Sequence, residues 1–272
     1  MLTKILEALI AVETRQLIED HYLKPLRLFG AAVDQALAPL RTAEFSAEVA
    51  RIARQLQLLD QWLRELPNQL KEALSDAGTI PHPELTLQDL ATVMRAHQTG
   101  GHQAAVSRIQ HLNEELFAQA DFRSSLRIRW HASRRHAVLE QVLSAHEAGL
   151  YAVSIPAALA QAEGIVADAA RHTGAMKLRH YKGYITQLGD EPNVDGPSVE
   201  HFVENFLLAS FRHGDPVPSF SRHAILHGAD VDYGSKEKSI RALVWVDYLL
   251  IRAEEQANAS QAVLKAPART KP

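Results

Sequence analysis

Apolar side chains recur every three or four residues along most of the chain, a spacing that places them on one face of an α-helix. The pattern predicts helices over residues 2–12, 26–40, 42 or 46 to 67, 87–97, 102–119, 198–209, 219–227 and 236–256. Two more helices, separated near Gly149, are expected between residues 122 and 171. No segment alternates as a β-strand does and no internal repeat is found, so the sequence predicts an all-α helical bundle.

Turn-forming and polar residues separate these helices. Residues 77–83 contain one glycine and two prolines and predict a loop, and a long polar connection is expected between residues 171 and 198. The helix over 150–168 is apolar almost all round, as a buried helix is, and Pro156 requires that it begin near Ser154 or bend there. Residues 257–272 are small, polar and mildly basic, which predicts a disordered tail.

Composition excludes several classes of protein. The 272 residues include no cysteine, which removes disulfide scaffolds, thiolate zinc sites, iron–sulfur clusters and cysteine nucleophiles. No window approaches the roughly 18 uninterrupted apolar residues that a membrane-spanning helix needs, and the N-terminus has an amphipathic pattern rather than that of a signal peptide. We therefore expect a cytoplasmic protein with no membrane partner.

Charge is distributed unevenly along the chain, although its formal net value is only −3. Residues 123–136 contain five arginines, two histidines and no acidic residue. On a helical wheel three of these arginines, Arg123, Arg127 and Arg134, fall on one stripe. Such a stripe either contacts RNA phosphates or is a solvated face that makes ion pairs.

The residues with the clearest chemistry lie in one short predicted helix, which Ser219 or Ser221 caps and Gly228 ends. It carries Arg222, His223 and His227. An arginine offers a permanently charged fork that matches phosphate oxygens, and a histidine near neutral pH takes a proton from a hydroxyl or returns one to a leaving group. These are the groups that cleavage of an RNA phosphodiester needs without a metal.

The spacing between Arg222 and His227 is not specific by itself, because similar arginine–histidine pairs occur at 15/21, 95/102 and 129/136. Its context is more specific. The run from Arg222 to Gly228, RHAILHG, is followed by DVDYGSKEKS from Asp230 and by an apolar helix that contains Asp247. Residues 147–164 read as a buried helix upstream of it.

These segments together resemble the HEPN superfamily (higher eukaryotes and prokaryotes nucleotide-binding), whose motif is an arginine, four to six residues and a histidine. The resemblance covers residues 121–256 and implies a four- or five-helix bundle that dimerises and places two arginine–histidine sets in one cleft. It leaves residues 1–120 as a helical region without an assigned role. Many members are metal-independent endoribonucleases of toxin–antitoxin or antiviral systems, and others are non-catalytic binding domains.

The resemblance implies roles for the motif residues. His227 is expected to act as the general base, Arg222 to stabilise the phosphate, and His223 to orient the site or contact RNA. Glu163 lies in an otherwise apolar helix, so it either holds Arg222 or reaches the surface at the helix edge. Tyr233 either lines the cleft or packs over the end of the helix.

His223 and His227 also form an i, i+4 pair that is able to bind a metal, but position 224 is alanine where metalloproteases have glutamate. We therefore expect neither a metal nor a cofactor. The expected partners are RNA, a second copy of the chain and an antitoxin or other regulatory protein. The alternative function is a non-catalytic nucleotide- or protein-binding dimerisation module.

Overall fold

A computed structural model describes residues 43–265 apart from 176, 190–195, 211, 213–215 and 218. The helices expected over 2–12 and 26–40 lie outside these residues. Within them all regular elements are helices, which confirms the all-α prediction. In chain order they are α4 (Ala43–Ala73), α5 (Leu87–Ala118), α6 (Ala120–His131), α7 (His136–Glu147), α8 (Tyr151–Ala169), α9 (Leu178–Gly189), α10 (Gly196–Phe202), the π-helical turn η3 (Val203–Leu207), α11 (Arg222–Leu226) and α12 (Lys236–Lys265).

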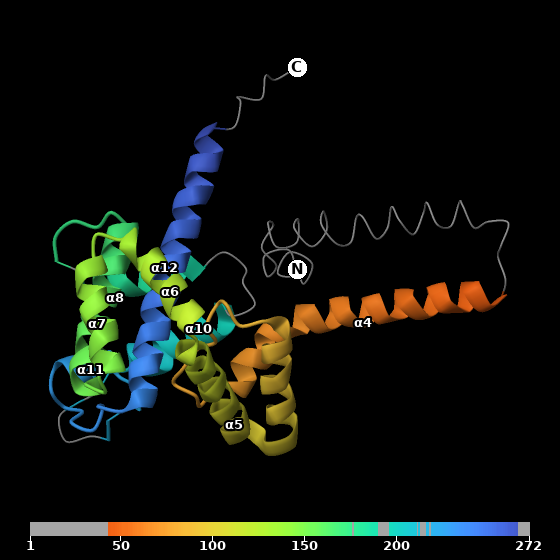
Figure 1. The fold of residues 1–272 in the computed structure, drawn as a ribbon, viewed down its shortest axis with the longest axis horizontal. Helices are drawn as coiled ribbons and strands as arrows, with labels where there is room; N and C mark the ends of the chain where they lie inside the picture. Colours follow the sequence, from red (N-terminus) through yellow and green to blue (C-terminus); the bar gives the residue numbers. More distant parts are fainter. Residues whose placement is uncertain are drawn as a thin grey trace.

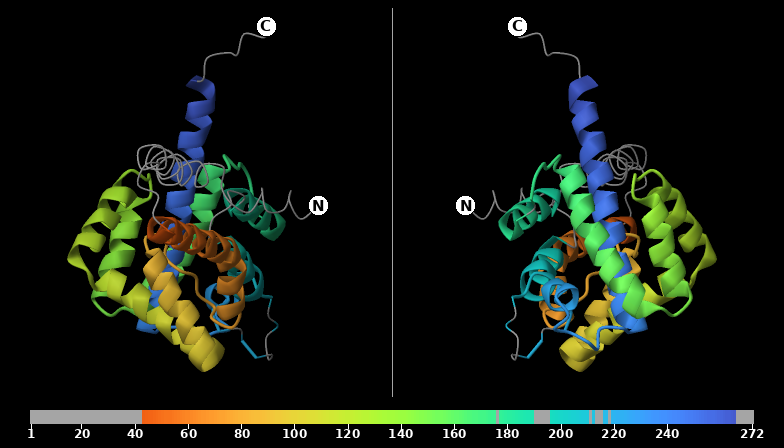
Figure 2. Two further views of the ribbon diagram at one scale, coloured as in Figure 1. Left: turned by 90° about the vertical axis from the view of Figure 1, so that its right-hand side faces the viewer. Right: turned by 90° about the vertical axis from the view of Figure 1, so that its left-hand side faces the viewer.

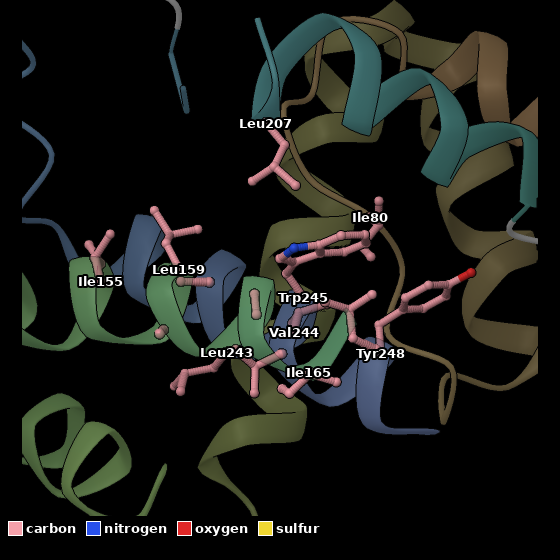
Figure 3. Packing of buried hydrophobic residues seen from close by; sticks show 14 of the residues in the cluster. Ile80, Ile155, Leu159, Ile165, Leu207, Leu243, Val244, Trp245 and Tyr248 are labelled. Carbon is pink, nitrogen blue, oxygen red and sulfur yellow. The ribbon is translucent and has the colours of Figure 1, made fainter. Parts of the chain in front are cut away.

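The main core lies around α12, the long blue helix at the middle of the bundle (Figure 1). Its most extensive neighbour is α8, and the two side views in Figure 2 keep these helices next to each other. Residues 242–246 of α12 are buried on every side, because helices surround this part of it. Figure 3 shows Trp245 among these side chains, with Leu207 of η3 and Ile80 close to its ring.

A second, smaller core is formed by the later part of α4 and by α5. Leu66 and Leu70 of α4 are completely buried there. The helix α5 begins at a capping box between Thr86 and Asp89 and bends at Gly101, whose φ of 70° is in the left-handed region that favours glycine. The bend falls between the two helices that the sequence predicted.

The two cores are joined by the loop between α4 and α5, where residues 77–82 are buried although they form no regular element. Side chains supply the hydrogen bonds that this backbone would otherwise lack. Asn113 donates to the carbonyl of Ile80 and accepts from the N–H of His82, and Arg241 donates to the carbonyl of Gly78. The predicted loop is confirmed, and it lies inside the protein.

The structure corrects two predicted boundaries in the first part of the chain. The helix expected to stop at Pro67 continues to Ala73, because burial of Leu66 and Leu70 outweighs the local cost of a proline. Residues 122–171 belong to three helices instead of two, since a turn at residues 132–135 separates α6 from α7.

Three further corrections concern the C-terminal part. The helix α8 begins at Tyr151 and includes Pro156. The expected polar connection contains α9, which buries Tyr181 and Ile185 on one face. The predicted disordered tail is wrong for residues 257–265, which continue α12 in a stretch rich in strong helix formers; residues 266–272 lie outside the described part.

Candidate active site

The short helix α11 is fixed at both ends by local hydrogen bonds. The hydroxyl of Ser221 accepts from the N–H of Ala224 at 3.2 Å and donates to the carbonyl of Ala209 at 3.0 Å. At the other end Gly228 has φ of 73°, and the N–H of Ala229 donates back to the carbonyl of Ala224 at 2.8 Å. Both helix ends that the sequence predicted are therefore confirmed: Ser221 caps the beginning of α11, and the chain leaves the helix at Gly228.

Arg222 begins α11 and pairs with Glu163, which lies on the buried helix α8. The two side chains are 17% and 30% exposed, so solvent screens their attraction only in part. The sequence left open whether Glu163 holds Arg222 or reaches the surface at the helix edge, and the structure shows that it pairs with Arg222. Burial lowers the pKa of Arg222, but an arginine side chain keeps its charge at neutral pH.

Tyr181 of α9 also contacts the guanidinium group. The Arg222 guanidinium carbon is 5.9 Å from the centre of the Tyr181 ring, within the range of a cation–π interaction. Burial raises the pKa of the Tyr181 hydroxyl, so the ring stays neutral. Arg222 is thus held between α8 and α9, and sequence reasoning missed Tyr181 because α9 was not predicted.

The imidazole rings of His223 and His227 are stacked, with centroids 5.5 Å apart and planes 28° apart. His223 is partly buried, whereas His227 is exposed at the C-cap of α11. Burial lowers the pKa of His223, and the nearby Arg222 and His227 lower it further. These effects favour the neutral form of the His223 ring, which is the form that accepts a proton.

Tyr233 lies away from this group and contacts the beginning of α8. Its ring packs against the main core, and its hydroxyl donates to the carbonyl of Ala152 at 3.1 Å. Pro156 has no N–H, so the helical donor that this carbonyl would use is missing. The structure therefore shows Tyr233 packed against the beginning of α8, a position that the sequence did not predict.

The three arginines of the predicted stripe are engaged by other groups. Arg123 donates to the carbonyls of Phe117 and Ala118 at the end of α5, and Arg127 pairs with Glu140 and Glu147. Arg134 lies in the turn after α6 and pairs with Asp168. They do not form one helical stripe, because α6 ends at His131.

A buried polar cluster around Asp247 was not predicted as a site. The carboxylate is completely buried and accepts from Trp130 at 2.8 Å, from two nitrogens of Arg129 at 2.7 and 3.2 Å, and from His82 Nε2 at 2.9 Å. The N–H of Glu84 donates to His82 Nδ1 at 3.1 Å, so the His82 proton is on Nε2. In the sequence, the feature that could have indicated this cluster is Asp247 itself, a single acidic residue in the apolar stretch of α12.

Burial alone would raise the pKa of Asp247, but hydrogen bonds from His82 and Arg129 lower it to below its ordinary range. The carboxylate has its hydrogen-bonding positions filled and no exposed surface, so it has no room for a substrate. Its role is to join the loop before α5 to α6 and α12.

Among the residues described by the structure, no group of three or more histidines and acidic residues is placed to hold a metal. None of the helices in that part of the chain has the length and apolar character needed to span a membrane. Comparison with models of protein families, with curated proteins and with solved structures gives no match to this chain.

Proposed function

We propose that this chain is a metal-independent endoribonuclease of the HEPN type, with Arg222 and His227 as its catalytic residues. One observation carries the proposal: a five-residue helix presents an arginine and two stacked histidines together, and the arginine is held by a carboxylate of a buried helix. A fixed cation beside an imidazole is the combination that phosphodiester cleavage by a neighbouring hydroxyl requires.

In the proposed reaction His227 takes the proton of the ribose 2′-hydroxyl. The 2′-oxygen attacks phosphorus, the bond from phosphorus to the 5′-oxygen breaks, and that oxygen takes a proton from solvent water as it leaves. The products are a 2′,3′-cyclic phosphate and a 5′-hydroxyl. Arg222 stabilises the negative charge that gathers on the phosphoryl oxygens as the bonds change.

The other residues near α11 act by positioning. Glu163 contacts Nη2 of Arg222, which leaves Nη1 to donate to a phosphate oxygen. His223 stacks on His227 and restricts the rotation of its ring. Tyr181 supports the guanidinium group from α9. Because these contacts come from different helices, the geometry of the site depends on the packing of the bundle.

The proposal extends to the assembly and its setting. A homodimer would bring two copies of α11 to one cleft, and a toxin or antiviral role in the cytoplasm would require an antitoxin or other protein that restrains the activity. Sedimentation of the purified chain tests the dimer, with a monomer at working concentration as the contradicting result.

Cleavage of a labelled structured RNA in excess EDTA tests the activity. We expect the parent to cut, and His227→Ala and Arg222→Ala each to reduce the rate at least about 100-fold, the usual scale for a general base. Matched controls are His111→Ala and Arg54→Ala, which change exposed groups outside α11 and should cut as the parent does.

Circular dichroism would first show that each variant folds. Cleavage by His227→Ala at the parent rate would overturn the assignment. A folded parent dimer that binds RNA or nucleotide without cutting would instead support the alternative, a non-catalytic binding module.

A further inference from the structure

The segment that leads from the end of α8 into α9 is basic and contains no acidic residue. Residues 169–189 include Arg171, Lys177, Arg179 and Lys182. The first three are exposed, and none of them contacts a carboxylate within the described part of the chain. Lys182 lies 4.0 Å from Glu204, and both of these side chains are partly exposed.

The arginines near α6 already contact carboxylates or helix carbonyls. No carboxylate partner of this kind is present at Arg171, Lys177 or Arg179 within the described residues. A phosphate that bound near α6 would have to displace those partners. At the three exposed cations it would mainly displace water and counterions. Figure 2 shows α9 on the outer side of the bundle.

Aromatic rings lie among these cations. The His172 ring is 5.1 Å from that of His180 and 5.7 Å from that of Tyr184, and His172 Nδ1 lies 3.2 Å from the Tyr184 hydroxyl. All three rings are partly exposed. Rings beside cations are what single-stranded nucleic acids use, because bases stack on the rings while the phosphates meet the charges.

The backbone at Arg171 gives a separate observation. Arg171 has φ of 50°, in the left-handed region where glycine is the usual residue. It follows the C-cap of α8, and the N–H of His172 donates to the carbonyl of Ala167 at 2.9 Å, as in the usual glycine-ended turn. The turn therefore carries a cation at a position whose backbone conformation glycine would adopt more easily.

Two helices link this surface to the candidate active site. Tyr181, between Arg179 and Lys182, supports the Arg222 guanidinium at 5.9 Å. Arg171 follows Glu163 by eight residues on α8 and its C-terminal turn, a rise of roughly 12 Å along a helix. A strand whose phosphate reached Arg222 would therefore have further phosphates near these cations.

We propose that six residues of this segment form a binding surface for single-stranded RNA that leads to Arg222, with Arg171, Lys177 and Arg179 contacting phosphates and the rings of His172, His180 and Tyr184 receiving bases. The inference rests on the proposed function, since it supplies the substrate surface for that site. It assigns RNA contact to this segment in place of Arg123, Arg127 and Arg134.

Fluorescence anisotropy with a labelled, fully 2′-O-methylated RNA oligomer tests the surface, since this probe binds but has no 2′-hydroxyl to react. The variant is Arg171→Gln/Lys177→Gln/Arg179→Gln. We expect its affinity to fall at least tenfold near 100 mM salt. The slope of log affinity against log salt should shrink by about 2, since each neutralised phosphate of a single strand contributes about 0.7. Tyr184→Ala should lower affinity by about tenfold, the scale of one stacked base.

The matched control is Arg54→Gln/Lys71→Gln/Arg95→Gln, which removes the same charge from α4 and α5 and should bind as the parent does. An equal fall in affinity for both triple variants would mean a general charge effect and would overturn the surface. A parent that fails to bind the probe would also overturn it. So would a result in which Arg171→Gln/Lys177→Gln/Arg179→Gln binds anionic vesicles less tightly than the parent but binds RNA as tightly.

The two proposals fail separately. If Arg222→Ala binds the probe normally and the parent cuts no RNA, the surface stands and the nuclease does not. If the parent cuts RNA and Arg171→Gln/Lys177→Gln/Arg179→Gln binds and cuts as well as the parent, the nuclease stands and this surface does not.

Discussion

The Tyr233 hydroxyl donates a hydrogen bond of 3.1 Å to the Ala152 carbonyl, the group that Pro156 leaves without a helical donor. The two residues are 81 positions apart in the chain. The contact ties the loop after α11 to the start of α8, and it explains how a proline is accommodated six residues into that helix.

Tyr233→Phe removes only the hydroxyl of this pair. We expect it to lower the free energy of unfolding by about 1 kcal/mol, because the Ala152 carbonyl loses its donor. Urea unfolding followed by circular dichroism measures the change. In a Pro156→Ala background the restored N–H of residue 156 replaces the donor, so the same substitution should cost less. An equal cost in both backgrounds would show that the hydroxyl does not serve this carbonyl.

Asp247→Asn changes the acceptor at the centre of the buried cluster. The expected cost is about 3–5 kcal/mol, because Arg129 would lose its fully buried charge partner and keep only the partly exposed Glu84. Denaturant unfolding at pH 7 measures it. Asp76→Asn, at an exposed position before the buried loop, is the matched control and should change stability little.

The lowered pKa of Asp247 also predicts a pH dependence. The folded carboxylate holds its charge to lower pH than the unfolded one, so its stabilising contribution is complete above the ordinary aspartate pKa, about 4. The contribution disappears as pH falls through the lower folded value. Asp247→Asn should therefore flatten the acid limb of the stability profile, and an unchanged acid limb would contradict the assignment.

Gly164→Ala tests the packing of the turn before α7 on α8. In a helix this change normally stabilises by about 1 kcal/mol. Here the new methyl group would collide with the guanidinium group of Arg135, which is bonded to Asp168 and Gln161. We expect the thermal midpoint to fall in the parent and to rise when Arg135 is also alanine. A rise in both backgrounds would mean that Arg135 moves aside without cost.

His223 should titrate below its ordinary value of 6.5 in a proton-detected imidazole titration, because burial and the charges of Arg222 and His227 disfavour its protonated form. Arg222→Gln should raise the midpoint, whereas Arg54→Gln, on the part of α4 that extends away from the bundle, should leave it unchanged (Figure 1). A midpoint at or above 6.5 in the parent would contradict the burial of the ring.

The same shift has a consequence for stability. The unfolded chain binds a proton at His223 more readily than the folded chain, so the free energy of unfolding should fall as pH drops below about 6.5. His223→Gln should remove that part of the slope, and comparison of unfolding at about pH 7.5 and about pH 5.5, on either side of the ordinary histidine pKa, measures it. An identical slope in the variant would assign the effect to other groups.

Local sequence patterns predicted most of the helices and several of their ends. Apolar periodicity located α5 and α12, Gly101 marked a bend, and Ser221 and Gly228 marked the ends of α11. These features depend on residues that are close together in the chain, so they can be recognised from the sequence alone. The helix α9 escaped detection because only Tyr181 and Ile185 among its described side chains are buried.

The sequence by itself determined the all-α class, the buried character of α8 and the grouping of Arg222, His223 and His227 on one short helix. Tertiary structure alone decided which charges meet: Glu163 with Arg222, 59 residues apart, and His82 with Asp247, 165 residues apart. It also decided that Arg127 and Arg134 pair with acids, whereas Arg179 of α9 meets none within the described residues. The reason is physical: a helical pattern fixes which face of a helix is buried, whereas the partner of a charge depends on which helices pack together.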